Sequence, residues 1–171
     1  SKNIGCFPTY KNKFKNLALT KWRTFILLLV YPKRFQILWK QVKPIQGFYM
    51  KYNWWSRYVP VLFHLPDVFH VQWAKDVEKW YFLKEKLDCK IVLSLRGAHI
   101  NYSPIANPAL AALYKTYFPK LDGFHAVSDA IGLEAQKYGA EASKMTTIHS
   151  LIPNSTFDLF NFPKVKKDKK L

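Results

Sequence analysis

Strands and helices alternate through the second half of the chain. Short apolar runs at 68–73, 90–95, 123–127 and 145–149 are typical of buried strands, and the residues between them have helical spacing. This alternation predicts an α/β fold, in which a parallel sheet has both faces covered by helices. Ligands of such sheets bind at the carboxyl ends of the strands. The polar residues that follow each run are therefore the place to look for a function.

The connecting segments carry clear local signals. Helices are predicted over 75–87 and 108–118, and a third begins after Ser128, a good N-cap, and runs to about residue 138. Residues 96–108, which contain one glycine and two prolines, are expected to form a loop. His70 falls inside the first apolar run, so we expect a hydrogen-bonded core histidine there.

The first part of the chain has a different pattern. Apolar residues at spacings of three and four predict a helix over 14–31, which Pro32 ends, and a second short helix over 33–43. The first helix could pack on the sheet with a basic outer face, or lie on a membrane with its lysines toward the headgroups. Residues 44–66 mix prolines with aromatic residues and give no assignable pattern.

Charge separates the two parts of the chain more sharply. The 171 residues are 49% hydrophobic and 17% aromatic, which excludes a disordered chain, and carry a net charge of +16. Residues 1–66 hold twelve Lys or Arg and no Asp or Glu. Such a field attracts phosphorylated lipid, membrane headgroups or nucleic acid. The two cysteines are too few for a disulfide scaffold, and the apolar runs are too short to span a membrane.

The candidate chemistry lies at the strand ends. Dinucleotide, P-loop, zinc and serine-hydrolase motifs are missing from the sequence, so we expect no metal site. Arginine offers a fork of donors to phosphate or carboxylate, glycine allows close backbone approach, and histidine can act as a base near neutral pH. Ordinary structural roles, an ion pair or a solvated loop position, explain these residue types equally well. The candidates that could line a ligand cleft are Gln72, Trp73, Arg96, Gly97, His99 and Asn101, and the candidates for anion binding are Ser128 and Ser150.

Four segments in order resemble a known family. They are the stretches at 67–74, 90–99, 122–128 and 144–152, which read DVFHVQWA, KIVLSLRGAH, DGFHAVS and KMTTIHSLI. They resemble the amino-terminal, acceptor-side domain of retaining GT-B glycosyltransferases of the "group 1", family 4 type, over residues 67–158. The resemblance implies a Rossmann-like fold and transfer of a sugar from a nucleotide-sugar to a glycan or lipid-linked acceptor.

The resemblance also sets expectations for individual residues. Arg96 and Gly97 fall where the family has a His-Gly or Arg-Gly pair that lines the cleft, whereas His99 stands where the family has an aspartate. The departure at His99 puts any role of that aspartate in doubt, and no catalytic residue can be named. The family's donor domain has no counterpart up to Leu171.

These observations give one expected organisation. Residues 1–66 form a basic aromatic helical segment, 67–158 the acceptor-side domain, and 159–171 a linker toward a missing donor domain. We expect this chain alone to lack transferase activity and to bind no cofactor, the nucleotide-sugar serving the complete enzyme. The expected location is cytoplasmic, peripheral at the inner face of the membrane. The alternatives are a non-catalytic nucleic-acid-binding module and a flavodoxin-like domain that binds a small molecule.

Overall fold

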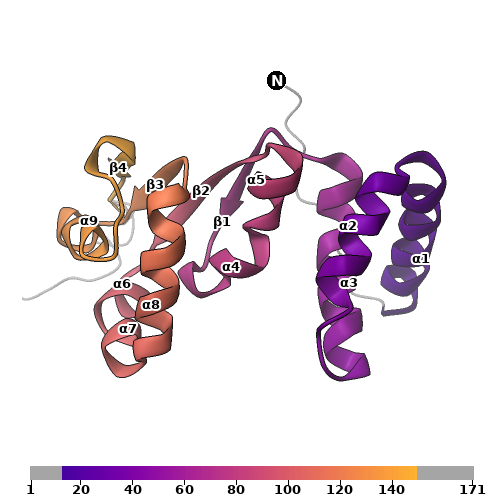
Figure 1. Ribbon diagram of the computed structural model, residues 1–171, viewed down its shortest axis with the longest axis horizontal. Coiled ribbons are helices and arrows are strands. Elements are labelled where there is room, and N and C mark those ends of the chain that lie inside the picture. Colours follow the sequence, from indigo (N-terminus) through magenta and orange to yellow (C-terminus); the bar gives the residue numbers. More distant parts are fainter. Residues whose placement is uncertain (1–12, 150–171) are drawn as a thin grey trace, which may run out of the picture. The chain divides into compact units, whose positions relative to one another are not determined.

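The computed structural model describes residues 13–149, and these form two compact units (Figure 1). Of the described residues, the first unit comprises residues 13–70 together with Lys79–Ile91, and the second comprises Val71–Glu78 and residues 92–149. The four-stranded sheet contains residues of both units, because β1 (Val68–Val71) and β2 (Lys90–Leu95) each cross the division.

Helices α1 (Lys13–Val30), α2 (Pro32–Val42) and α3 (Phe48–His64) contact one another in the first unit. Pro32 is at the first position of α2, where its missing N–H costs nothing, so the proline both ends α1 and starts α2. The fully buried side chains of these helices include Leu27, Leu38 and Leu62. The two helices predicted from the apolar spacing are thus confirmed.

Helix α3 occupies the segment that the sequence left unassigned. Its buried residues Trp54, Tyr58 and Leu62 recur every four residues, which gives one apolar face despite Pro60 inside the helix. Leu65 takes a left-handed conformation with φ 39° and ends the helix. Aromatic residues and an internal proline have poor helix propensity, so tertiary packing stabilises this helix.

An aromatic cluster joins α3 to the segment 79–91 within the first unit. The Tyr58 ring lies 5.1 Å from Trp80 and 5.3 Å from Phe82, both edge to face, and its hydroxyl donates to the Lys79 carbonyl oxygen at 3.1 Å. Trp54 packs beside it, 5.3 Å from the Tyr58 ring. This cluster explains why residues 79–91 belong to the helical unit rather than to the rest of the α/β region.

The fold is α/β, with a Rossmann-like parallel sheet flanked by helices, as the alternation of elements predicted. The strand order is β1-β2-β3-β4, with β3 at Gly123–Ala126 and β4 at Met145–Thr147. Strand β3 pairs in parallel with both neighbours, placing Leu95 beside Ala126 and Ala126 beside Thr147. The order is consecutive, so these four strands contain no reversal of the kind that creates a binding crevice in doubly wound sheets.

The edge strand β1 corrects two expectations. Strand β2 is buried along most of its length, as parallel strands in the middle of a sheet are, whereas three of the four residues of β1 are at least partly exposed. The expectation of a buried first strand was therefore wrong, and so was that of a core histidine, because His70 is exposed. An edge position leaves one side of the strand uncovered, which the apolar sequence does not reveal.

The connections between strands are more helical and more broken than predicted. The expected helix over 75–87 is divided into η1 (Ala74–Asp76), α4 (Val77–Trp80) and α5 (Phe82–Leu87). The expected loop over 96–108 was wrong: it contains α6 (Gly97–Asn101) and α7 (Ser103–Ala106). Its two prolines lie in the first turns of α7 and of the next helix, where proline favours helix formation.

Two longer helices cover one face of the sheet in the second unit. In α8 (Pro108–Tyr117), Tyr114 stacks on Phe118, whose ring lies 5.7 Å from Phe124 in β3. In α9 (Asp129–Gln136), Gly132 lies against Ala126 of β3 and Met145 of β4. The predicted N-cap is confirmed, since the Ser128 hydroxyl accepts from the Ile131 N–H at 3.4 Å. Two 3-10 turns, η2 (Phe118–Lys120) and η3 (Ala142–Lys144), lead into β3 and β4.

The aromatic cluster generates a prediction about stability. Tyr58 is 3% exposed, so Tyr58→Ala should lower the free energy of unfolding by about 3–5 kcal/mol, and Tyr58→Phe, which removes the hydroxyl that donates to the Lys79 carbonyl oxygen, by about 1 kcal/mol. Tyr49→Ala is the matched control, because Tyr49 is 76% exposed on the same helix and should change stability by less than about 0.5 kcal/mol. Urea denaturation measures all three, and equal effects at positions 49 and 58 would contradict the packing described.

Candidate functional site

The carboxyl ends of β2 and β3 lie at the same edge of the sheet. Leu95 and Ala126, the last residues of the two strands, are register partners, so Arg96 and Val127 leave the sheet side by side. Helix α6 follows Arg96, helix α9 begins after Ser128, and these two helices contact each other. The structure therefore brings together the segments in which strand-end reasoning placed the candidates.

Four predicted residues form one contact network at this edge, which we call the Trp73 cluster: Gln72, Trp73, Arg96 and His99. The Arg96 guanidinium donates to Gln72 Oε1 at 3.0 Å and lies 5.2 Å from the centre of the Trp73 ring. The His99 ring lies 4.9 Å from the same indole, tilted by 37°. Trp73 remains 48% exposed, so the cluster presents an aromatic surface bordered by a cation and an amide.

His99 is positioned by its backbone as well as by its ring. The Tyr114 hydroxyl donates to the His99 carbonyl oxygen at 3.2 Å, and burial raises the pKa of Tyr114, which keeps this donor protonated. His99 Nδ1 is buried, and it has no hydrogen-bond partner among the described residues 13–149. Burial lowers the pKa of His99, and the nearby charges of Lys75 and Arg96 lower it further, while Asp76 opposes them. The imidazole is therefore neutral at pH 7, with one nitrogen able to accept a proton or a hydrogen bond.

Gly97 is not required by the fold. Among the described glycines, positive φ angles occur at Gly47 and Gly139, not at Gly97. An added Cβ at position 97 would meet only Ile131 Cδ1, at an ordinary contact distance of 3.8 Å. A methyl group therefore fits at position 97 in contact with Ile131, and glycine leaves this spot beside the backbone unfilled.

The remaining candidates do not join the cluster. Ser128 uses its hydroxyl as a helix cap, and Asp129 in the first turn of α9 places a negative charge where an anion would bind. Asn101 is two residues beyond His99 in α6, which turns it about 200° around the helix to the opposite side. Ser150 lies outside the described residues.

Sequence reasoning missed several residues that set the electrostatics of the site. Lys75 and Asp76 come from η1, directly after Trp73, and Tyr114 comes from α8. The position of η1 after a strand end was a usable signal for the first two, whereas the hydrogen bond from Tyr114 depends on tertiary packing. Ser94 Oγ and His125 Nδ1 lie 3.3 Å apart on neighbouring strands, a contact that the alternation of residues alone does not reveal.

Comparisons with models of protein families, with curated proteins and with solved structures give no match for this chain. Within residues 13–149, no three His, Cys, Asp or Glu side chains are grouped so as to hold a metal ion. Over the same residues, no helix has both the length and the apolar character needed to cross a bilayer. The chemistry of the site must therefore be argued from its own geometry.

The Trp73 cluster has the features of a binding surface. An exposed indole offers a rigid apolar face, the guanidinium attracts anionic or hydroxyl oxygens, and the neutral imidazole accepts a hydrogen bond. A polyhydroxylated ring with one apolar face, such as a sugar, matches these three groups.

The electrostatics of His99 yield a prediction. Lys75→Gln should raise the pKa of His99 toward its ordinary value of 6.5, and Asp76→Asn should lower it further, because each removes one of the charges that act on the ring. The control Lys115→Gln removes an exposed lysine of α8 and should leave the His99 titration unchanged. NMR titration of the imidazole protons measures all three.

The sign of the linked stability change follows from the same shift. The folded-state pKa of His99 lies below the unfolded value, so the folded chain binds fewer protons. The contribution of His99 to the free energy of unfolding is therefore present above about pH 6.5 and is lost as the pH falls through the folded-state pKa. A His99 titration unaffected by both Lys75→Gln and Asp76→Asn would contradict the described surroundings.

Proposed function

We propose that residues 67–149 form the acceptor-side wall of a retaining GT-B-type glycosyltransferase, which moves a sugar from a nucleotide-sugar to a glycan or lipid-linked acceptor. The observation that carries the proposal is the Trp73 cluster, in which Arg96, directly after β2, contacts Gln72 and Trp73, which directly follow β1. The resembling motifs lie on these strand ends. The parallel sheet is the architecture that the resemblance implies.

Each member of the cluster has a proposed role in holding the acceptor. The Trp73 indole stacks on the apolar face of a sugar ring, and the Arg96 guanidinium, steadied by Gln72, donates to acceptor hydroxyl or phosphate oxygens. His99, neutral at pH 7, accepts a hydrogen bond from an acceptor hydroxyl. These are positioning roles, and the nucleotide-sugar donor is held by a second domain or subunit of the complete enzyme.

The cytoplasmic face of a membrane is the location that this proposal favours. The described part of the basic segment, residues 13–66, contains cations and no acids, and an anionic leaflet attracts such a surface. A lipid-linked acceptor would be met at that surface.

The proposal predicts binding of simple glycosides at Trp73. Octyl-β-glucoside below its micellar concentration, titrated into isotopically labelled chain, should shift the NMR signals of the Trp73 indole and of amides in α6. Trp73→Ala should weaken this binding at least fivefold, because truncating an aromatic anchor removes about 1 kcal/mol or more. Tyr102→Ala is the matched control, since Tyr102 is 72% exposed at the end of α6, outside the cluster.

Contrary outcomes are easily recognised. Equal loss of glycoside binding in Trp73→Ala and Tyr102→Ala would show that the Trp73 cluster is not the binding site. Sugar transfer by the chain alone would show that it also holds the donor, against the expected division into two walls.

Gly97 supplies a test that separates folding from binding. Gly97→Ala should keep or slightly raise stability, by up to about 1 kcal/mol, because alanine favours the helix and its Cβ fits. The same substitution should weaken glycoside binding, since the methyl group fills the spot beside the backbone that glycine leaves unfilled. Gly139→Ala is the opposite control: Gly139 has a φ of +92°, which side chains rarely adopt, and its Cβ would lie 2.7 Å from Pro119 Cγ, so stability should fall. Thermal unfolding and the octyl-β-glucoside titration report the two effects, and unchanged binding in Gly97→Ala would exclude close approach there.

A further inference from the structure

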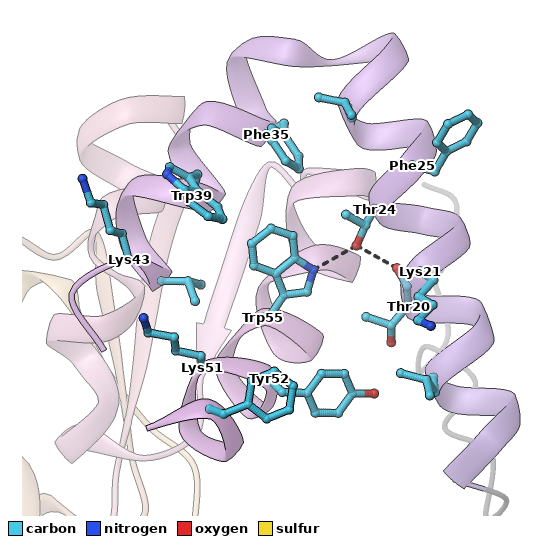
Figure 2. A pocket seen from close by; sticks show the side chains of 14 residues that line it. Thr20, Lys21, Thr24, Phe25, Phe35, Trp39, Lys43, Lys51, Tyr52 and Trp55 are labelled. Carbon is cyan, nitrogen blue, oxygen red and sulfur yellow. Dashed lines mark hydrogen bonds between the residues drawn. The ribbon is translucent and has the colours of Figure 1, made fainter. Parts of the chain in front are cut away.

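The three helices of the first unit line an open apolar pocket of about 620 Å³, which Figure 2 shows from close by. Its volume falls in the range of small-molecule sites. Residues of α1, α2 and α3 all contribute to its wall, and its main apolar side chains are Leu17, Phe25, Leu28, Phe35, Trp39 and Trp55.

Three polar side chains on the pocket wall are satisfied within the protein. Trp55 Nε1 donates to Thr24 Oγ1 at 2.9 Å, and the Thr24 hydroxyl donates to the Thr20 carbonyl oxygen at 2.8 Å (Figure 2). The Thr20 hydroxyl in turn donates to the carbonyl oxygen one turn earlier, at 2.8 Å. Each of these donors is already used, so a ligand gains mainly apolar contact from this part of the wall.

Lysines provide the charge around this apolar interior. Lys43 and Lys51 lie on the side formed by α2 and α3, and Lys21 lies on the α1 wall (Figure 2). No acidic residue occurs before Asp67 in the sequence, so no carboxylate of the three helices can neutralise these amines. An apolar interior with a cationic border matches a molecule that has an apolar tail and an anionic head.

We propose that this pocket binds one acyl chain of an anionic phospholipid, with the lipid phosphate held by Lys43 and Lys51. The inference does not rest on glycosyl transfer and concerns a different unit of the chain. A second copy of this chain is a poor occupant, because it would bring a second set of cations to the same surface. Nucleic acid is also disfavoured, since the Trp55 ring meets Phe35 and Trp39 edge to face rather than presenting an open stacking surface.

The probe is dodecanoyl-lysophosphatidylglycerol below its micellar concentration, titrated into the full chain by calorimetry. Saturable one-to-one binding is expected. Shortening the chain to decanoyl should weaken binding about 15-fold, because each buried CH₂ group is worth about fourfold. The matching zwitterionic lysophosphatidylcholine should bind more weakly than the anionic lipid.

Two pairs of variants locate the site. Leu28→Glu places a carboxylate in the pocket and should abolish binding. Leu29→Glu makes the same change at the next residue, which is 64% exposed and outside the pocket, and should retain binding. The double variant Lys43→Gln/Lys51→Gln should lose about fivefold in affinity per lysine. Its control, Lys33→Gln/Lys40→Gln, has the same net charge but changes exposed lysines of α2 outside the pocket and should retain binding. Circular dichroism confirms that each variant is folded, and the lysine pairs, all at the surface, keep the test informative if Leu28→Glu unfolds.

Several results would overturn the proposal. Equal losses of lipid affinity in both lysine pairs would show that net charge alone causes the effect. A lipid affinity that does not depend on chain length would exclude an acyl chain in the pocket. If the chain forms a dimer and Leu28→Glu dissociates it, a second copy of the chain occupies the pocket instead of a lipid. Binding of a single-stranded oligothymidylate without any saturable lipid binding would favour nucleic acid.

Discussion

The placement of the candidate site depends on the parallel pairing of β2 and β3 in one register. Leu93 and Leu95 lie beside Phe124 and Ala126 on the face that α8 and α9 cover, whereas Ser94 lies beside His125 on the opposite face. A slip by one residue would move Ser94 or His125 into the apolar layer, so the burial of one face fixes the register. The same register makes β2 and β3 end together, which brings Arg96 to the edge where α9 begins.

The cations of α1, α2 and α3 have no acidic partners within residues 13–66, because this segment contains no Asp or Glu. They interact instead with rings and carbonyl groups. Arg57 lies 4.9 Å from the Trp54 ring, and Arg34 donates to the Leu62 and Phe63 carbonyl oxygens at 3.2 and 3.4 Å, near the end of α3. Such contacts fix a cation without neutralising it. The unit therefore keeps its positive field while packing an aromatic interior.

The sequence was most informative where local chemistry decides the structure. The bounds of β2 and the cap at Ser128 follow from an apolar run and from a hydroxyl before a helix. One proline was misread, because Pro104 lies in the first turn of a helix in a segment that was expected to be a loop. Pro60 lies inside α3, in a segment that the sequence left unassigned. Without α3 the apolar pocket could not be foreseen, since all three helices form its wall.

For the candidate site, strand-end reasoning found the four residues of the Trp73 cluster but not their contacts. The exposure of His70 and the bond from Tyr114 to His99 both depend on which neighbours cover a strand or a helix, and one sequence does not specify this. The general rule about strand ends says where ligands bind, so it identifies the correct segments of the chain. The role of each side chain can then be inferred only from its residue type.

The consecutive strand order adds a constraint on how any ligand is held. Doubly wound sheets form a crevice where the strand order reverses, and β1 to β4 contain no such reversal. The exposed Trp73, Gln72 and Arg96 therefore present one wall rather than an enclosed pocket. Ligand pockets usually enclose most of the ligand, whereas a single wall leaves half of it in water, so its interactions must compete with solvent. A Trp73 cluster that holds a sugar tightly thus requires a second surface opposite it, which the proposed second domain or subunit would supply.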